Sequence, residues 1–336
     1  MINRNIAIVA LGLALGGCGG GQIEESTPSV STGETAPSLQ AAGDFLDAYA
    51  RTYRFTLGRP KAVKPSPDGK SVFFLRSPGR SFVQDLYEFD LSSGKERVLL
   101  TADAILGGGE ENLSAEEKAR RERMRMTSRG IAAYDLSDDG AKILVPLSGR
   151  LFIVNRADMG VKELNPKLRQ GFPIDPQFSP DGSMISCVRE GDVFVQNIMT
   201  GEEIMVTPGA SGAVSYGAAE FAAQEEMSRF HGYWWSPDSS AICYQVTDVK
   251  DVMTYYIADP VNPHKEPEAS PYPKCGTPNA SVKLEIAKLD GSSRVRVSWD
   301  FDRYPDLANV KWSKNAPLTI LVQNREQTEQ VLYAVA

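Results

Sequence analysis

Short runs of apolar residues, interrupted by polar ones, recur along the chain. The five clearest are SVFFLR (71–76), AKILVPL (141–147), SMISCVR (183–189), SAICYQV (240–246) and LTILVQ (318–323). Runs of about 4–8 residues with few charges are typical of β-strands, whereas a helix repeats its apolar residues every three or four positions. Three of them lead on to a second strand-like run, such as DLYEFD (85–90). The pattern therefore predicts an all-β fold built from antiparallel strands.

One turn motif precedes each of these runs. Its copies are PSPDG (65–69), LSDDG (136–140), FSPDG (178–182), WSPDS (235–239) and the degenerate WSKN (312–315). Proline presets φ for a turn, the aspartate bonds its own backbone, and glycine accepts a positive φ. The closest copies, at Ser137 and Ser179, have the spacing of a propeller blade, roughly 40–50 residues, and the longer gaps need insertions.

A partial β-propeller is therefore predicted for residues 59–336. Each blade of a propeller is a small sheet that buries its faces only against neighbouring blades, which explains why the same turn returns several times. A β-sandwich with coincidental turns is the alternative.

Two insertions interrupt this repeat and are predicted to be helical. The first, residues 101–130, contains LSAEEKARRERMR, in which Ser114 and Glu117 have the spacing of a capping box. The second, residues 215–232, reads SYGAAEFAAQEEMSRFHG. A propeller blade consists of strands, so helices in the loops between strands indicate a functional surface carried by a rigid scaffold.

The first 18 residues are predicted to be a lipoprotein signal peptide. Arg4 precedes the apolar run 6–15, which is shorter than the roughly 20 residues that span a bilayer. The run ends in LGGC, which resembles the bacterial lipobox and makes Cys18 the expected site of lipidation; a plain signal peptide with an incidental cysteine is the alternative. We therefore expect an exported lipoprotein, anchored by its lipid on the periplasmic side of a membrane or in the outer membrane.

Two further segments precede the propeller. Residues 19–38 are rich in Gly, Ser, Thr, Pro and Glu, a composition typical of a flexible tether. Residues 39–58 are expected to be a helical or extended lead-in. The predicted order is signal peptide, tether, lead-in and propeller.

Charge and cysteine content exclude several kinds of site. The net charge of −7 argues against a nucleic-acid partner. Cys187 and Cys243 lie in apolar strand-like runs, where buried free thiols are expected. Because there is no CxxC pair and only His231 and His264 could add imidazole, neither a metal site nor a cofactor is predicted.

The adjacent acids Glu225 and Glu226 are the first candidates for binding. Nothing structural requires two neighbouring carboxylates, which repel each other. Both could accept charge-assisted hydrogen bonds from one peptide α-ammonium group, which has three donors. The alternative is a solvated acidic patch.

An arginine cluster in the first insertion is the second candidate. It consists of Arg120, Arg121, Arg123, Arg125 and Arg129. Arginine forks suit carboxylates and carbonyls, but most of these side chains are expected to solvate one helix face or to pair with Glu116, Glu117 and Glu122.

No catalytic residue is predicted in this chain. A hydrolase serine needs a sharp turn such as G-x-S-x-G between strand and helix, and the sequence does not contain that motif. His264 lies in a proline-rich loop without triad spacing. We therefore do not expect the chain alone to cleave a peptide bond.

One long segment carries a family resemblance. Residues 215–248 resemble the N-terminal domain of dipeptidyl peptidase IV and its bacterial relatives, through Phe221, Gln224, Glu225–Met227 and the run Trp234–Pro237. YPKCGTPNASVKLEIAKLDG (272–291) resembles another segment of the family, with Ala280 where proline is usual, and the arginine-bearing helix is similar to a third. The resemblance runs from about residue 44 to the end.

The resemblance implies a fold and an activity. It implies an eight-bladed propeller next to an α/β-hydrolase domain in a serine peptidase that releases N-terminal Xaa-Pro or Xaa-Ala dipeptides. It assigns Glu225 and Glu226 to the substrate's free N-terminus and a propeller arginine to a substrate carbonyl; Arg123 is the preferred candidate for this arginine, with its neighbour Arg125 as the alternative. The turns cover only part of eight blades and the family's Ser, Asp and His have no counterpart here, so the chain is expected to be truncated before the hydrolase domain.

Two functions remain open at this point. One is the substrate-recognition domain of an exported serine dipeptidyl peptidase. The other is a non-catalytic surface lipoprotein whose propeller binds peptides or proteins.

Overall fold

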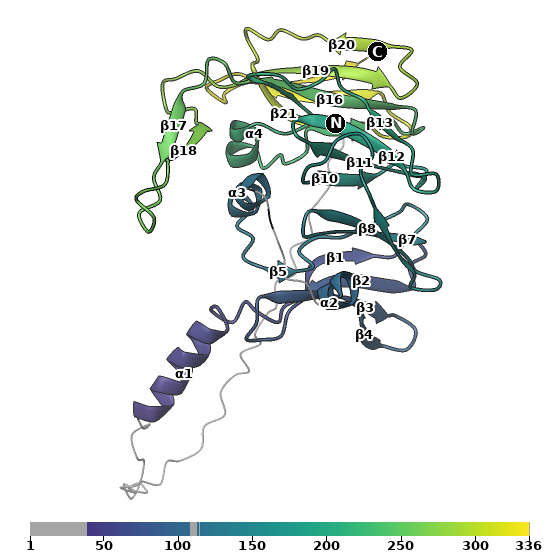
Figure 1. Ribbon diagram of the computed structural model, residues 1–336, viewed down its shortest axis with the longest axis vertical. Helices are drawn as coiled ribbons and strands as arrows, with labels where there is room; N and C mark the ends of the chain where they lie inside the picture. Colours follow the sequence, from purple (N-terminus) through teal and green to yellow (C-terminus); the bar gives the residue numbers. More distant parts are fainter. Residues whose placement is uncertain (1–38, 108–112, 114, 336) are drawn as a thin grey trace, which may run out of the picture. The chain divides into compact units, whose positions relative to one another are not determined.

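The computed structural model describes residues 39–107, 113 and 115–335 (Figure 1). The signal peptide, Cys18 and the tether lie outside the described residues, as does Ser114 of the expected capping box. The chain divides into two compact units, residues 1–47 and 48–336. None of the helices in the described part of the chain has the length and hydrophobicity needed to cross a bilayer.

The lead-in begins with α1 (Leu39–Arg51). The helix ends because Thr52 bonds the preceding backbone: its hydroxyl donates to the carbonyl oxygen of Ala48 (2.6 Å) and accepts from the N–H of Phe55 (2.9 Å). Residues 53–55 then adopt positive φ values and turn the chain away from the helical direction.

Three sheets follow along the chain, each with four antiparallel strands in sequence order, and the first also holds a short fifth strand. The first has the order β1 (Lys61–Pro65), β2 (Ser71–Arg76), β3 (Val83–Asp90) and β4 (Lys95–Leu100), with β5 (Arg129–Gly130) parallel to β3. The second has the order β6 (Asp135–Leu136), β7 (Lys142–Leu147), β8 (Arg150–Asn155) and β9 (Val161–Leu164). The third has the order β10 (Ile174–Phe178), β11 (Met184–Arg189), β12 (Asp192–Asn197) and β13 (Glu203–Met205).

A five-stranded sheet, a three-stranded sheet and a hairpin complete the described strands. The fourth sheet has the order β14 (Val214–Tyr216), β16 (Ala241–Asp248), β19 (Ser281–Lys288) and β20 (Arg294–Val297), and β15 (Tyr233–Trp235) also pairs with β16. The fifth has the order β21 (Asp306–Lys311), β22 (Leu318–Gln323) and β23 (Gln330–Val335). Between β16 and β19, strands β17 (Thr254–Ile257) and β18 (Glu268–Pro271) form a separate hairpin.

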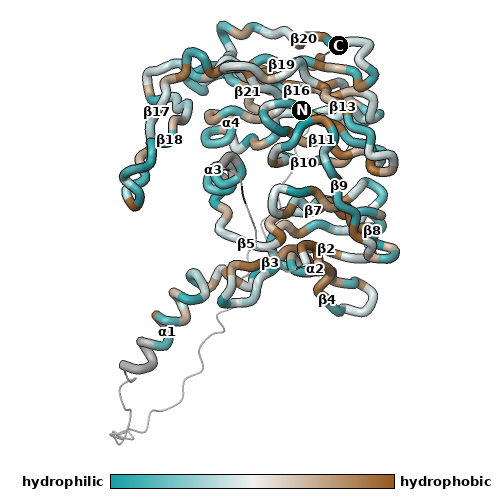
Figure 2. The backbone as a smooth tube through the Cα atoms, in the orientation of Figure 1, coloured by the Kyte–Doolittle hydropathy of each residue, from teal (hydrophilic) through white to brown (hydrophobic). Residues whose placement is uncertain are grey.

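Each sheet buries its faces against the sheets before and after it in the chain. Phe73 of the first sheet shares a core with Val145 of the second, and Ile153 of the second shares a core with Ile185 of the third. The same holds from the third sheet to the fourth and from the fourth to the fifth. Figure 2 shows the hydrophobic residues concentrated in these stacked strands.

This serial stacking confirms the predicted propeller architecture. In a sandwich, two sheets would share a single core, and every further strand would join one of them. Here successive sheets have successive cores, so the sandwich alternative is wrong. The buried thiols expected at Cys187 and Cys243 are also observed, whereas Cys275 is exposed.

The two insertions contain helices. The first holds α2 (Ala102–Leu106) and α3 (Ala115–Arg123), and the second holds α4 (Phe221–Glu226). Figure 1 shows α3 and α4 next to each other although they come from different insertions, and side-chain contacts described below join them.

Four copies of the repeated turn, those at Ser66, Ser137, Ser179 and Ser236, link two neighbouring strands of their sheet by the same side-chain bonds. In the copy at 236–239, the Ser236 hydroxyl donates to Asp238 (2.6 Å) and accepts from the N–H of Ala241 (2.8 Å). The Ser236 hydroxyl is also the main cause that lowers the pKa of Asp238 to about 2, followed by the hydroxyl and N–H of Ser240. The copies at Asp68 and Asp139 have lowered pKa values, with the matching serine hydroxyl as the main cause.

These turns are expected to lose stability in acid. A carboxyl whose pKa is lower in the folded chain stabilises the fold above its unfolded pKa, about 3.9 for aspartate, and this contribution disappears as the pH falls toward about 2. In urea unfolding at a series of pH values, the free energy of unfolding of Asp238→Asn should therefore fall less between pH 4 and 2 than that of the unaltered chain. Asp302→Asn, at an exposed residue, is the control; parallel curves for all three proteins would contradict the prediction.

Candidate functional site

Helix α4 presents the two candidate acids at its C-terminal end. The N-terminal end begins at Glu220, whose side chain accepts a hydrogen bond from the N–H of Ala223 (3.2 Å). Ala222 and Ala223 are buried, so the helix is pressed against the sheet on that side. Glu225 and Glu226 are exposed. Carboxylates are unfavourable at a helix C-terminus, so their position does not stabilise α4.

The two acids differ in their partners. The nearest cation of Glu225 is Arg123, with 4.0 Å between Nε and the carboxylate oxygen. Glu226 has no hydrogen-bond or ion-pair partner among the described residues. At least one of the two carboxylates is therefore available to a cationic ligand.

Arg123 comes from α3 and faces α4. Its Nη1 donates to Oε1 of Gln224 (3.3 Å), and its guanidinium lies 5.4 Å from the centre of the Phe221 ring. Gln224 is itself held by a bond from its Nε2 to the carbonyl oxygen of Ala219 (2.6 Å). An arginine fork thus lies beside the acidic pair, in an orientation set by a fixed amide.

Arg125 does not join this group. It lies two residues past the end of α3 and has a positive φ of 53°. Its side chain is exposed and lines a different cavity of about 740 Å³ beside α2 and β5. Of the two arginines, the preferred Arg123 and the alternative Arg125, the structure brings only Arg123 to Glu225.

Aromatic side chains border the site. The Phe221 ring meets the Tyr272 ring edge to face, with 4.8 Å between centroids, and Tyr272 lies 5.7 Å from Tyr255 of β17. The hairpin region of the fourth sheet thus extends an apolar wall from α4. Such a wall beside charged groups suits a ligand with one charged end and an apolar body.

Comparison with known proteins identifies the family. Residues 137–336 match the family described as the dipeptidyl peptidase IV N-terminal region. The chain belongs to this family.

Two curated relatives of this N-terminal region are peptidases by name. This chain is 28% identical over 208 residues to dipeptidyl peptidase 8 of Homo sapiens, and the alignment covers 54% of this chain and 23% of the relative. It is 27% identical over 174 residues to dipeptidyl peptidase 4 of Felis catus, covering 47% of this chain and 22% of the relative. The chain spans less than a third of the length of these relatives.

A solved structure has the same fold as this N-terminal region. It is the crystal structure of Porphyromonas gingivalis dipeptidyl peptidase 4, with a TM-score of 0.63 and 23% sequence identity. The match covers 90% of this chain and 41% of the other. The propeller predicted from the repeated turn is therefore confirmed.

The other arginines of the cluster have structural roles or lie apart. Arg121 is buried and its Nε contacts Glu117 one helical turn away (3.0 Å), which is the pairing expected from the sequence. The Arg129 backbone pairs with β3. The Arg120 side chain lies outside what the structure describes.

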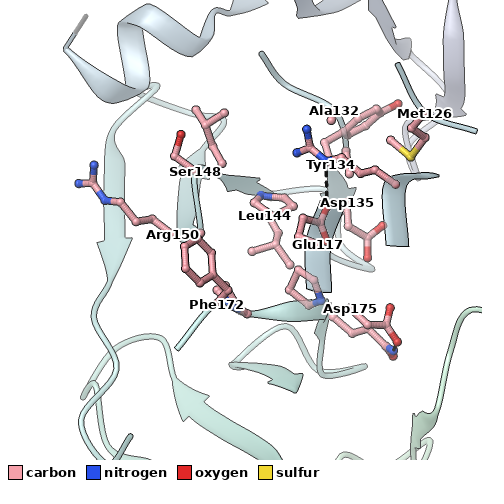
Figure 3. A pocket seen from close by; sticks show the side chains of 18 of the residues that line it. Glu117, Met126, Ala132, Tyr134, Asp135, Leu144, Ser148, Arg150, Phe172 and Asp175 are labelled. Carbon is pink, nitrogen blue, oxygen red and sulfur yellow. Dashed lines mark hydrogen bonds and ion pairs between the residues drawn. The ribbon is translucent and has the colours of Figure 1, made fainter. Parts of the chain in front are cut away.

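A second cavity is lined by residues of α3 and of the first three sheets (Figure 3). It has a volume of about 590 Å³, and Tyr134, Leu144 and Phe172 contribute to its lining. Several of its ionisable groups have partners, as Lys64 has in Asp135 (2.6 Å) and as His231 has in Asp175 (2.8 Å between Nδ1 and the carboxylate). The described residues contain no group of three or more side chains that could hold a metal ion.

Sequence reasoning missed three residues of the site region: Tyr272, Glu220 and Arg229. Tyr272 was quoted only as part of a family segment. Glu220 directly precedes the run FAAQEE, so a search for a helix-capping acid would have found it. Arg229 gives no local signal, because its side-chain partners come from several segments.

Proposed function

We propose that this chain is the peptide-recognition part of a serine dipeptidyl peptidase, and that Glu225 and Glu226 bind the α-ammonium group of the substrate. The observation that carries the proposal is the arrangement at the end of α4. Two exposed carboxylates lie side by side where the helix gains nothing from them, with Arg123 and an aromatic wall next to them.

The chemistry of a peptide N-terminus fits this arrangement. An ammonium group can donate to both carboxylates at once through charge-assisted bonds. In the described residues Arg123 uses one N–H for Gln224, and a guanidinium has five, so donors remain for the first carbonyl oxygen of the peptide. Phe221 and Tyr272 would contact the apolar parts of its side chains.

The cleavage step would occur on an α/β-hydrolase domain that acts as the partner of this propeller. The names of the relatives support this, since they are dipeptidyl peptidases. An anchored ammonium group would fix how far the peptide reaches into that domain, so a serine acting through an acyl-enzyme would release Xaa-Pro or Xaa-Ala dipeptides. No residue of this chain is assigned a catalytic role.

The proposed location is outside the cytoplasm. Lipid attached to Cys18 would anchor the protein to a membrane, and the segment 19–38 would hold the propeller away from it.

A comparison of two ligands tests the proposed binding mode. The tripeptide Ala-Pro-Ala and its N-acetylated form differ in the ammonium group, and calorimetry with the chain should show the free tripeptide binding at least about 30-fold more tightly, equivalent to roughly 2 kcal/mol. Binding of the free tripeptide should also weaken above about pH 8, where an α-amino group loses its proton. Equal affinity for both ligands would contradict the proposal.

A further inference from the structure

A buried ion pair lies directly behind the exposed acids. Glu220, which begins α4, and Arg229, which follows the helix, are joined by a contact of 3.2 Å between Oε2 and Nη2. Their side chains are only 7% and 6% exposed. Neither carboxylate nor guanidinium can therefore reach a ligand in solvent.

Arg229 contacts three separate parts of the second unit. Besides Glu220, its Nη1 donates to the carbonyl oxygen of His231 (2.7 Å), just before β15. Its Nε donates to the carbonyl oxygen of Leu307 in β21 (3.1 Å), the first strand of the next sheet. One guanidinium thus connects the helix to two neighbouring sheets.

Both ends of α4 depend on this pair. At the N-terminal end, Glu220 accepts from the N–H of Ala223 with one oxygen, and from Nε2 of Gln245 (2.6 Å) with the other. At the C-terminal end, the N–H of Arg229 donates to the carbonyl oxygen of Ala223 (2.9 Å). The side chain of Arg229 binds the residue that begins the helix, while its backbone closes the last turn.

A helix of this length needs such support. α4 has six residues, and helices much shorter than about 12 residues are unstable on their own in water because nucleation is costly. Its direction is therefore set by what holds its ends. A buried ion pair is poor evidence of added stability, since desolvating both charges offsets their attraction, which leaves the fixing of geometry as its main effect.

We infer that Glu220 and Arg229 are positioning residues that fix the direction of α4, and hence the placement of Glu225 and Glu226. The inference rests on the proposed function for the link from placement to peptide binding. Placement itself is a separate, measurable property of the helix.

Lysine cannot replace Arg229 in this role. An ammonium group is a compact charge on a flexible stem, whereas the guanidinium is a planar fork with donors in fixed directions. Arg229→Lys therefore keeps the charge opposite Glu220 but loses the simultaneous bonds to β21 and to the segment before β15. Glu220→Gln retains an acceptor for the helix start and removes the charge.

Two measurements on the chain test the inference. Hydrogen exchange should become at least about 10-fold faster for the amides of residues 221–229 in Arg229→Lys, and less so in Glu220→Gln, with unchanged exchange in β11 and β12. The affinity for Ala-Pro-Ala should fall at least about 10-fold in Arg229→Lys. Arg150→Lys is the matched control, because Arg150 also binds a carboxylate with its fork but belongs to the second sheet.

Each outcome separates the inference from the proposed function. Unchanged exchange of residues 221–229 in both variants would overturn the inference, as would faster exchange spread evenly over all sheets, which would show a general loss of stability. If α4 loosens but the unaltered chain does not distinguish Ala-Pro-Ala from its acetylated form, the positioning role stands and the peptide-binding proposal fails.

Discussion

Replacing both Glu225 and Glu226 by glutamine should lower the affinity for a peptide with a free N-terminus by between about 30-fold and a few thousand-fold. This corresponds to roughly 2–5 kcal/mol, the usual cost of losing one partner of a hydrogen-bonded charge pair. Glutamine keeps the size of each side chain, and both positions are exposed, so folding should be unaffected. Calorimetric titration with Ala-Pro-Ala measures the change.

The matched control for this variant removes two negative charges elsewhere. Glu202 and Glu326 are exposed and lie in turns, Glu202 just before β13 and Glu326 between β22 and β23. Glu202→Gln with Glu326→Gln should leave the affinity within about twofold, because neither side chain belongs to the proposed site and salt screens exposed charges. If the two double variants bind equally well, the assignment of Glu225 and Glu226 is wrong.

The largest effect on stability is expected at Arg189. Its side chain and that of Glu203, with which it forms an ion pair across the third sheet, are each 3% exposed. Arg189 also donates to the carbonyl oxygen of Arg169 (2.8 Å) and stacks on Phe194. Arg189→Met would leave a buried carboxylate without its cation, so the free energy of unfolding should fall by about 3–5 kcal/mol. Urea unfolding at pH 7 measures it.

The second sheet provides a matched control for this substitution. Arg150 binds Glu163 with its fork and stacks on Phe152, as Arg189 does with its own partners, but the Arg150 and Glu163 side chains are 45% and 30% exposed. Arg150→Met should lower the free energy of unfolding by less than about 1 kcal/mol, because water screens an exposed ion pair. Arg189→Met combined with Glu203→Met should recover much of the loss. Equal costs for the two single variants would show that burial does not decide the effect.

The sequence predicted those features whose causes are local. The turn at Ser236 and Asp238 forms from residues within five positions of each other, so the local sequence is enough to predict it wherever it occurs. The strands after each turn follow from their alternation, and stacking of repeated sheets follows from the repetition itself. For the same reason both helical insertions were located before the structure was known.

The site could be predicted only in part, because its geometry depends on long-range contacts. Glu225 and Glu226 were visible as a pair, but Arg123 meets them from a segment about a hundred residues earlier. Arg123 ends α3, whereas Arg125, two residues later, itself has a left-handed backbone, which no local sequence motif predicts. Likewise, Arg229 takes a partner from β21. That partner is a backbone carbonyl oxygen, which every residue has, so no residue type in the sequence marks it.

The serial stacking of the sheets also bears on how such a protein can change over evolutionary time. Among the described residues each sheet shares its cores with the sheets next to it, and α3 and α4 lie in segments that leave the stack between strands. Insertions in these segments can lengthen, shorten or exchange their side chains while the cores between sheets keep their composition. Ligand preference and thermal robustness are therefore separately adjustable traits in this architecture, except at Arg229, where one residue belongs to both.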